Sequence, residues 1–362
     1  MQEAPPRRED SRSSKTAGGR FGPRLRLRRL APAARLLVTL AVTFLGLVFV
    51  TFMIGRILPI DPVLAAVGDR APADVYERVS REMGLHLPLW EQFLTYLIKI
   101  LKGDFGQSVL TAQPVLSDIK RVFPATLELA TLATIFGVVL GIPMGVAAAV
   151  YRNRWPDQLV RVIGLVGYSV PVFWLGLVGL LLFYAKLEWV SGPGRLDFLY
   201  EDFYEPQTGL ILVDSFLSGD RDVFWNAVSH IILPASILAY YSLAYIARMT
   251  RSFMLDQLQQ EYIITARVKG LSEWTIIWRH ALSNVMVPLV TVVALSYANL
   301  LEGSVLTEIV FAWPGLGLYI TNSLLSADMN AVLGGTLVVG SVFIGLNLLS
   351  DLLYRLLDPR AR

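Results

Sequence analysis

Residues 129–150 read LATLATIFGVVLGIPMGVAAAV, a run of 22 residues without one charged side chain. A helix needs about 20 mostly apolar residues to cross the hydrocarbon core of a bilayer, so this run is long enough. Backbone polar groups inside a bilayer must be satisfied within the segment, which requires a helix. Five further uncharged windows have a similar character and cover residues 36–55, 162–185, 231–247, 281–301 and 329–350. The sequence therefore predicts an all-α polytopic membrane protein with six transmembrane helices.

The composition agrees with this prediction. Of the 362 residues, 54% are apolar and only 17% are charged, against about 25% charged in soluble domains. The alternative, that the windows are buried helices of a large soluble protein, would need six such segments in one chain. Cysteine is absent and the three histidines are widely separated, so the sequence predicts no disulfide and no metal site.

The distribution of basic residues predicts how the chain is oriented. Residues 1–35 contain ten basic and three acidic side chains, which places this tail in the cytoplasm by the positive-inside rule. The loops after the second and fourth windows are also basic, whereas the loop after the third holds eight acidic and three basic residues. Both termini are therefore expected in the cytoplasm. The expected boundaries are a disordered basic tail at 1–30, a first transmembrane helix at 31–58, an outer loop at 59–124 and five further helices within 125–362.

The loop between the fourth and fifth windows is the most informative segment. Residues 253–284 read FMLDQLQQEYIITARVKGLSEWTIIWRHALSN. Apolar residues recur at helical spacing up to Gly270, a residue type that accepts the left-handed backbone beyond a helix end, and Ser272 can cap a second helix. The segment is thus predicted to be a helix, a glycine turn and a helix. From its residues alone, it could equally be an interfacial helix that rests on lipid headgroups.

The same segment resembles the cytoplasmic loop of permeases in binding-protein-dependent ATP-binding-cassette (ABC) importers, and above all its dipeptide/oligopeptide version. That version has Glu-Tyr-Ile-x-Thr-Ala-Arg-x-Lys-Gly-Leu followed by Arg-His-Ala-Leu-x-Asn, and residues 261–271 and 279–284 match both parts. The resemblance is to the first-permease type and extends over nearly all of residues 36–362. It includes RILPIDP at 56–62, GDFGQS at 103–108, PATLELA at 124–130 and EIVFAWPGLG at 308–317.

The resemblance implies a function and a set of partners. It implies an inner-membrane permease that forms half of a pathway for di- or oligopeptides, paired with a second related permease. Two separate ATPase subunits would bind ATP and Mg, and a periplasmic binding protein would deliver the solute; no cofactor is expected on this chain. The residues implied in ATPase coupling are Glu261, Tyr262, Thr265, Ala266, Arg267, Lys269, Gly270, Leu271 and His280. The outer-loop signature comprises Glu308, Phe311, Trp313, Pro314, Gly315 and Gly317.

Side chains that contact the solute are harder to predict. Charged groups at membrane depth tend to face a cavity or a partner, although near the interface they also pair or snorkel. The carboxylates at the predicted outer span ends are Glu128, Glu302 and Glu308, and the aromatic residues around Pro171 are Tyr168, Phe173 and Trp174. Each of these six side chains could instead pack or pair within the protein. The solute itself (dipeptide, oligopeptide, glutathione, nickel chelate, opine or sugar) is not specified by this chain.

Other functional classes fit the sequence less well. The chain contains no Gly-x-x-x-x-Gly-Lys-Ser/Thr phosphate loop and no metalloprotease or hydrolase motif, so we predict that it is not an enzyme. An ion-coupled secondary transporter is the alternative function. Such proteins usually carry inverted repeats and ion-binding residues at mid-membrane, and the six windows lack carboxylates. Nothing in the sequence indicates binding to nucleic acid.

Overall fold

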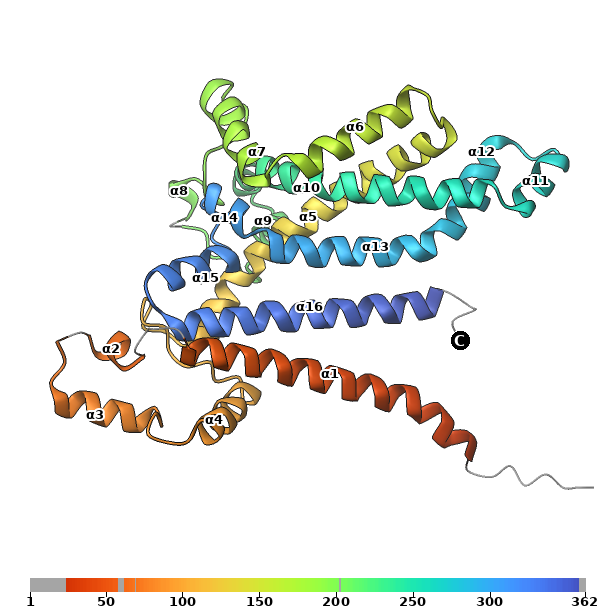
Figure 1. Ribbon diagram of the computed structural model, residues 1–362. Coiled ribbons are helices and arrows are strands. Elements are labelled where there is room, and N and C mark those ends of the chain that lie inside the picture. Colours follow the sequence, from red (N-terminus) through yellow and green to blue (C-terminus); the bar gives the residue numbers. More distant parts are fainter. Residues whose placement is uncertain (1–23, 58–61, 69, 202, 358–362) are drawn as a thin grey trace, which may run out of the picture. The chain divides into compact units, whose positions relative to one another are not determined.

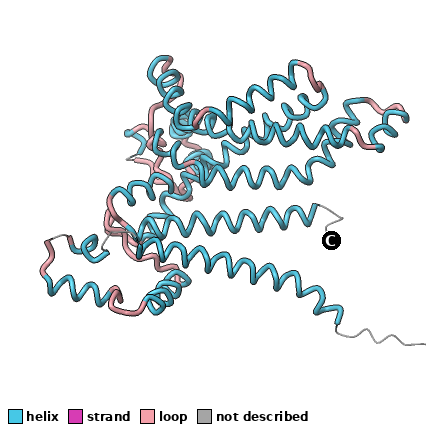
Figure 2. The backbone as a smooth tube through the Cα atoms, in the orientation of Figure 1, coloured by secondary structure: helices cyan, strands magenta, loops and turns pink. Residues whose placement is uncertain are grey.

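The computed structural model describes residues 24–57, 62–68, 70–201 and 203–357, and every regular element in these ranges is helical (Figures 1 and 2). By its internal contacts the chain divides into residues 1–45 and residues 46–362. All contacts below lie within the second unit. The expected disordered tail falls mostly outside the described residues, and helix α1 (Arg24–Ile57) already begins within its predicted range.

Five helices in the described ranges are long and apolar enough to cross a membrane, or six if one bent pair counts as a single span. The third predicted window lies in the bent pair and the other five lie in the long helices, which extend beyond the windows at one or both ends. The long helices are α1, α5 (Val115–Val150), α10 (Arg221–Leu258), α13 (Leu282–Gly303) and α16 (Met329–Leu357).

The third predicted span is not one continuous helix. Its residues form α6 (Trp155–Ser169), then α7 (Val172–Gly179) and the π-helical segment η1 (Leu180–Lys186), and the two parts meet at 97°. The break lies at Val170, which is extended (φ −98°, ψ 125°) and precedes Pro171. A residue before proline is disfavoured in the α conformation, so the local sequence explains where the helix breaks.

Among the described residues, the most extensive helix–helix contact is that of α5 with α10. Gly137, Gly141 and Gly145 recur every four residues and therefore lie on one face of α5. A Cβ atom at Gly145 would lie 2.6 Å from the Ala247 carbonyl oxygen, and one at Gly137 would lie 2.5 Å from the Ser242 hydroxyl. These small residues let the two backbones approach, as is common where helices pack in membranes.

The long helices define two ends of the unit formed by residues 46–362 (Figure 1). We call the end that carries α11 (Glu261–Val268) and α12 (Glu273–Thr275) the α11 end; it also carries the connection from α5 to α6. The other, which we call the α14 end, carries the remaining short helices. These are α2 (Pro62–Val67), α3 (Ala73–Glu82), α4 (Leu89–Leu101), α8 (Phe198–Glu201), α9 (Ile211–Ser218), α14 (Val305–Val310) and α15 (Leu316–Leu325).

Candidate functional site

The segment predicted as one amphipathic helix before Gly270 is two helices. Helix α10 ends at Leu258, and α11 begins at Glu261 after Gln260, which is extended (φ −74°, ψ 149°). The apolar spacing that predicted a continuous helix therefore runs across a break. The chain then continues through α12 into the π-helical segment η2 (Ile276–Ala281) and α13.

The turn after α11 has the predicted form. Gly270 has φ +79°, a left-handed backbone that is costly for residues with a Cβ atom. The Leu271 amide donates a hydrogen bond to the Ala266 carbonyl (3.2 Å), which closes the end of the helix. Ser272 caps α12, since its side chain accepts a hydrogen bond from the Thr275 amide (3.4 Å).

One narrow face of α11 fixes the helix to the long helices. Ile263 is fully buried and Ala266 is 8% exposed. Both belong to a cluster with Met254 of α10 and with Ile276 and Ala281 of η2, all three of which are also buried. A displacement of α11 would therefore move the ends of α10 and α13, because close-packed interiors transmit strain.

The opposite face of α11 and the adjoining turn present apolar side chains to the outside. Val268 is 83% exposed and Trp274 is 71% exposed, and Ile264 and Leu271 are exposed as well. Charged residues flank them, with Glu261, Arg267 and Lys269 all on the surface. We call Ile264, Val268, Leu271 and Trp274, with these flanking charges, the α11 surface. It combines apolar anchors with a charged rim, which is the chemistry of a groove-binding helix.

Most of the predicted coupling residues thus lie on or beside the α11 surface. Arg267 forms a two-pronged ion pair with Glu273 across the turn (2.8 and 3.2 Å). The Tyr262 hydroxyl donates to Gln257 (2.8 Å) and accepts from the Asn284 amide (3.0 Å), which braces α11 on both neighbouring helices. Thr265 is exposed, whereas His280 is half-buried in η2. Ala266 faces the core, so its contribution is to packing.

At the α14 end, Glu308 is fully buried and holds three segments together. Its Oε1 atom accepts hydrogen bonds from the hydroxyls of Thr126 (2.7 Å) and Ser304 (3.0 Å). Its Oε2 atom accepts one from the Leu318 amide (2.9 Å). Burial raises the pKa of the Glu308 carboxyl, and the hydrogen bonds act in the opposite direction. We call this arrangement the Glu308 clasp.

The glycines of the outer-loop signature make room for the clasp. A Cβ atom at Gly315 would lie 2.5 Å from both Glu308 Cδ and Thr126 Oγ1, and one at Gly317 would lie 2.9 Å from Glu308 Oε2. Trp313 is 1% exposed and donates from its indole nitrogen to the Ala125 carbonyl (2.9 Å). Phe311 is also buried, whereas Pro314 is exposed. The signature thus joins α14 and α15 to the start of α5 rather than forming a surface.

Two buried carboxylates, Glu128 and Asp157, form three ion pairs that were not predicted from the sequence. Glu128 pairs with Arg195 of the loop before α8 and accepts from the Leu212 amide (2.7 Å). Asp157, fully buried at the α11 end, accepts from both Arg251 of α10 and Arg161 of α6. The Arg161 pair follows i, i+4 spacing and could have been found. The partners in the other two pairs are 67 and 94 positions apart, and only the fold brings them together.

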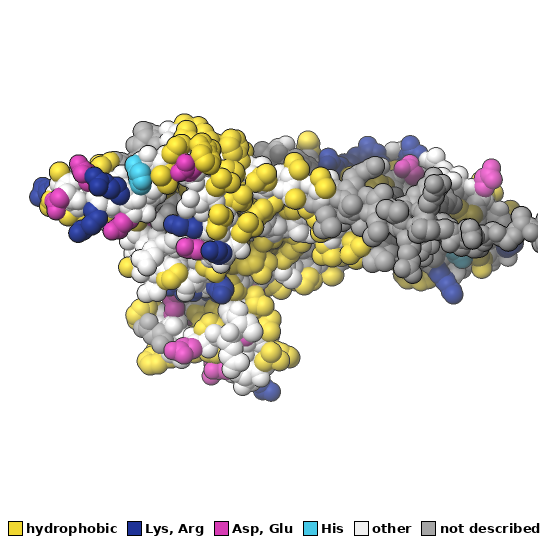
Figure 3. All heavy atoms as spheres, turned by 90° about the horizontal axis from the view of Figure 1, so that it is seen from below, with side chains coloured by type: hydrophobic (Ala, Val, Ile, Leu, Met, Phe, Trp, Pro, Cys, Tyr) yellow, Lys and Arg dark blue, Asp and Glu magenta, His cyan; other side chains and the backbone are white. Residues whose placement is uncertain are grey.

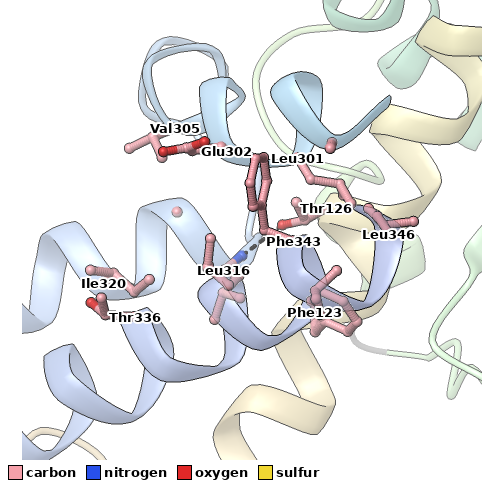
Figure 4. A pocket seen from close by; sticks show the side chains of 14 residues that line it. Phe123, Thr126, Leu301, Glu302, Val305, Leu316, Ile320, Thr336, Phe343 and Leu346 are labelled. Carbon is pink, nitrogen blue, oxygen red and sulfur yellow. Dashed lines mark hydrogen bonds between the residues drawn. The ribbon is translucent and has the colours of Figure 1, made fainter. Parts of the chain in front are cut away.

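The other candidate solute contacts divide between cavity and surface. Glu302 lines a mostly apolar cavity of about 170 Å³ between α5, α13, α15 and α16 (Figure 4). Thr126, which belongs to the Glu308 clasp, also lines this cavity, and its hydroxyl accepts a hydrogen bond from the Leu316 amide (2.8 Å). Phe173 and Trp174 are exposed, and the side chain of Tyr168 lies outside the described set. The carboxylates of Glu128 and Glu308 are engaged in the buried ion pair and hydrogen bonds described above.

Comparison with known proteins gives a consistent result. The model of the family "binding-protein-dependent transport system inner membrane component" matches residues 141–362, and the model of its N-terminal part matches residues 27–130. The chain is 44% identical over 318 residues to the "probable D,D-dipeptide transport system permease protein DdpB" of Escherichia coli (strain K12), covering 87% of this chain and 92% of that one. It is 41% identical to the di/tripeptide transport system permease protein DppB of Pseudomonas aeruginosa (strain UCBPP-PA14), covering 91% and 98%.

A solved structure is also similar. It is an inward-facing form of the MetNI methionine ABC transporter, with a TM-score of 0.48 and 19% identity, covering 65% of this chain and 93% of that chain.

Proposed function

This chain belongs to the family of inner membrane components of binding-protein-dependent transport systems, and we propose that it forms half of a pathway for di- or oligopeptides. The relatives named above carry peptides by their names, at 41–44% identity over most of the chain. A second related permease supplies the other half. Separate ATPase subunits drive alternating access, and a periplasmic binding protein delivers the peptide. The protein is a multi-pass membrane protein of the inner membrane.

In this proposal the α11 end faces the cytoplasm and the α14 end faces the periplasm. The bent pair of α6 with α7 and η1 counts as one span, which gives six spans and places both termini in the cytoplasm. The basic side chains of the loops at 151–161 and 248–280 lie on the α11 side, as the positive-inside rule requires. The acidic loop at 186–230 lies on the other side and suits a binding protein with basic side chains at its docking face.

The observation that carries the proposal is the two-faced character of α11. Its buried face binds α11 to the ends of two long helices, and its exposed face offers apolar anchors among charges. An ATPase that takes this helix into a groove can therefore displace the spans as rigid bodies. The catalytic chemistry lies on the partner, which binds ATP and Mg; this chain contributes the mechanical connection.

The test is to replace Val268 by aspartate in the assembled transporter. A charge at the most exposed apolar position of the α11 surface should abolish copurification of the ATPase subunits and peptide uptake into proteoliposomes, while the permease remains folded. Leu325→Asp, at an equally exposed site (82%) of the α14 end, is the matched control and should retain the ATPases. Unchanged ATPase binding by the Val268 variant would contradict the proposal. Uptake driven by an ion gradient, without ATPases or binding protein, would instead indicate the secondary transporter.

A further inference from the structure

A second, larger cavity lies at the α14 end, apart from the α11 surface and the Glu308 clasp. Its volume is about 530 Å³, and its walls are the end of α1, the connection from α3 to α4, one side of α4 and the start of α16. Unlike the cavity beside Glu302, it is lined by charged and polar side chains. Those used below are Arg56, Glu82, Gln92, Tyr96, Lys99 and Asp104.

The position of this cavity relative to the membrane follows from the ends of the two spans beside it. Arg56 lies in the last turn of α1, directly after the apolar window, and α16 starts at Met329. A Cβ atom at Gly55 would lie 2.7 Å from Leu333 Cδ1, so the end of one span adjoins the start of the other. The cavity therefore opens where apolar spans end, which is the depth of the lipid headgroups.

Helix α4 lies along the last turns of α1 at this depth. The ring of Phe93 packs against those of Phe49 and Phe52, with 5.5 Å between centroids in both cases. On its other face Leu94, Ile98 and Leu101 are 46–68% exposed and recur at helical spacing. This stripe lies on a different face of α4 from Gln92, Tyr96 and Lys99, which line the cavity. A helix with one apolar and one polar face, at the end of two spans, suits the membrane interface. Figure 3 shows charged side chains gathered around α3 next to an expanse of hydrophobic surface.

Among the described residues, two lining donors, Arg56 Nε and Tyr96 Oη, and one lining acceptor, Gln92 Oε1, are buried without a hydrogen-bond partner. Gln92 is fixed, since its amide nitrogen donates to the carbonyls of Leu85 (3.2 Å) and Leu87 (2.8 Å). Burial raises the pKa of Tyr96 to about 12, so its hydroxyl keeps its proton and can donate. Buried polar groups are nearly always paired, so unpaired donors beside a cavity of this size indicate a ligand that accepts hydrogen bonds.

The cavity also contains charges of both signs. Arg56 and Lys99 form no ion pair among the described residues, and Glu82 and Asp104 contribute carboxylates. Arginine and lysine bind phosphate oxygens, the former with a fork of donors. We propose that this cavity binds the phosphoethanolamine-type headgroup of a phospholipid. The phosphate contacts Arg56, Tyr96 and Lys99, and the ammonium group lies toward the two carboxylates.

The experiment uses the full-length chain purified in detergent, with dihexanoyl-phosphatidylethanolamine as the probe and native mass spectrometry as the measurement. Arg56→Gln and Tyr96→Phe should each weaken binding about tenfold, since a hydrogen bond to a charged group is lost. The control is Arg279→Gln, an exposed arginine near the α11 end, which should bind as the unaltered chain does. Size-exclusion and thermal unfolding profiles of all three variants check that the fold is kept.

Two further probes separate the sources of the signal. Dihexanoylglycerol, which lacks the phosphate, should bind at least about tenfold more weakly, and free phosphoethanolamine should compete with the lipid. The proposal would be overturned if both variants bound the lipid as tightly as the unaltered chain does. It would also be overturned if the unaltered chain bound dihexanoylglycerol as tightly as dihexanoyl-phosphatidylethanolamine. Displacement of the lipid by a dipeptide, but not by phosphoethanolamine, would also overturn it and would assign the cavity to the transported solute. Transport activity does not enter the readout, so the result is independent of the proposed function.

Discussion

The α11 surface and the Glu308 clasp are both recognisable sequence motifs, yet the fold uses them in opposite ways. The motif at 261–271 leaves most of its side chains outside, with Val268 83% exposed, whereas Glu308 of the motif at 308–317 is fully buried. Exposed apolar residues next to charges are available to a partner, while buried polar groups are committed to contacts within the chain. A distinctive motif therefore does not reveal by itself whether it binds something or holds the fold.

The largest effect is expected from Glu308→Ala. It would leave the Thr126 and Ser304 hydroxyls and the Leu318 amide without their acceptor inside the protein. The free energy of unfolding should fall by about 3–5 kcal/mol, because each unsatisfied buried donor costs about 1–3 kcal/mol. Thermal unfolding in detergent measures this loss. Glu302→Ala, which removes an exposed carboxylate, is the control and should change little; similar losses in both variants would show that the clasp has no special role.

A smaller loss is expected from Ile263→Ala under α11. The side chain is fully buried, and removing its outer carbons should cost about 3 kcal/mol through lost burial and a cavity. The neighbouring Ile264→Ala should leave stability within about 0.5 kcal/mol and instead weaken ATPase binding, because Ile264 is 55% exposed. The pair divides α11 into a packing face and a binding face. Equal destabilisation by both substitutions would contradict that division.

Gly270→Ala tests the turn between the two faces. With φ +79°, an added Cβ atom should cost about 1–2 kcal/mol of stability, and no neighbouring atom lies within 4 Å to add a clash. Gly303→Ala is the matched control, since its surroundings are equally open and it ends α13 without a positive φ. Circular dichroism melts of both variants give the comparison. An alanine at 270 that is as stable as glycine would mean that the turn relaxes freely.

The smallest effect is expected from Arg267→Gln. Its ion pair with Glu273 is exposed on both sides, so stability should change by less than about 1 kcal/mol. If Arg267 contributes to the α11 surface, ATPase affinity should fall and become less sensitive to salt, since one charged contact is removed. Titration of the ATPase at two ionic strengths, alongside a melt, provides both quantities. A large loss of stability with unchanged affinity would make Arg267 a residue of the fold rather than of the interface.

Local features of the fold followed directly from the sequence. The six uncharged windows correspond to the apolar helices, the left-handed backbone at Gly270 and the cap at Ser272 were predicted correctly, and the motif matches indicated the family that the comparisons confirm. The residue before Pro171 is disfavoured in the α conformation, so the local sequence explains where the third span breaks, although not the angle of the break. These properties depend on residues that are neighbours along the chain, where propensity and spacing act directly.

The tertiary structure decided which side chains meet. The amphipathic run is interrupted at Gln260, and Ile263 and Ala266 beyond the break pack against Met254 and η2; no local pattern shows either feature. The partners of Glu308, Glu128 and Asp157 come mostly from distant segments. The cavity around Arg56 needs helices from opposite ends of the sequence. Burial and hydrogen bonding depend on what surrounds a group in space, so the sequence fixes the helices and their motifs, while the fold assigns each motif to packing or to binding.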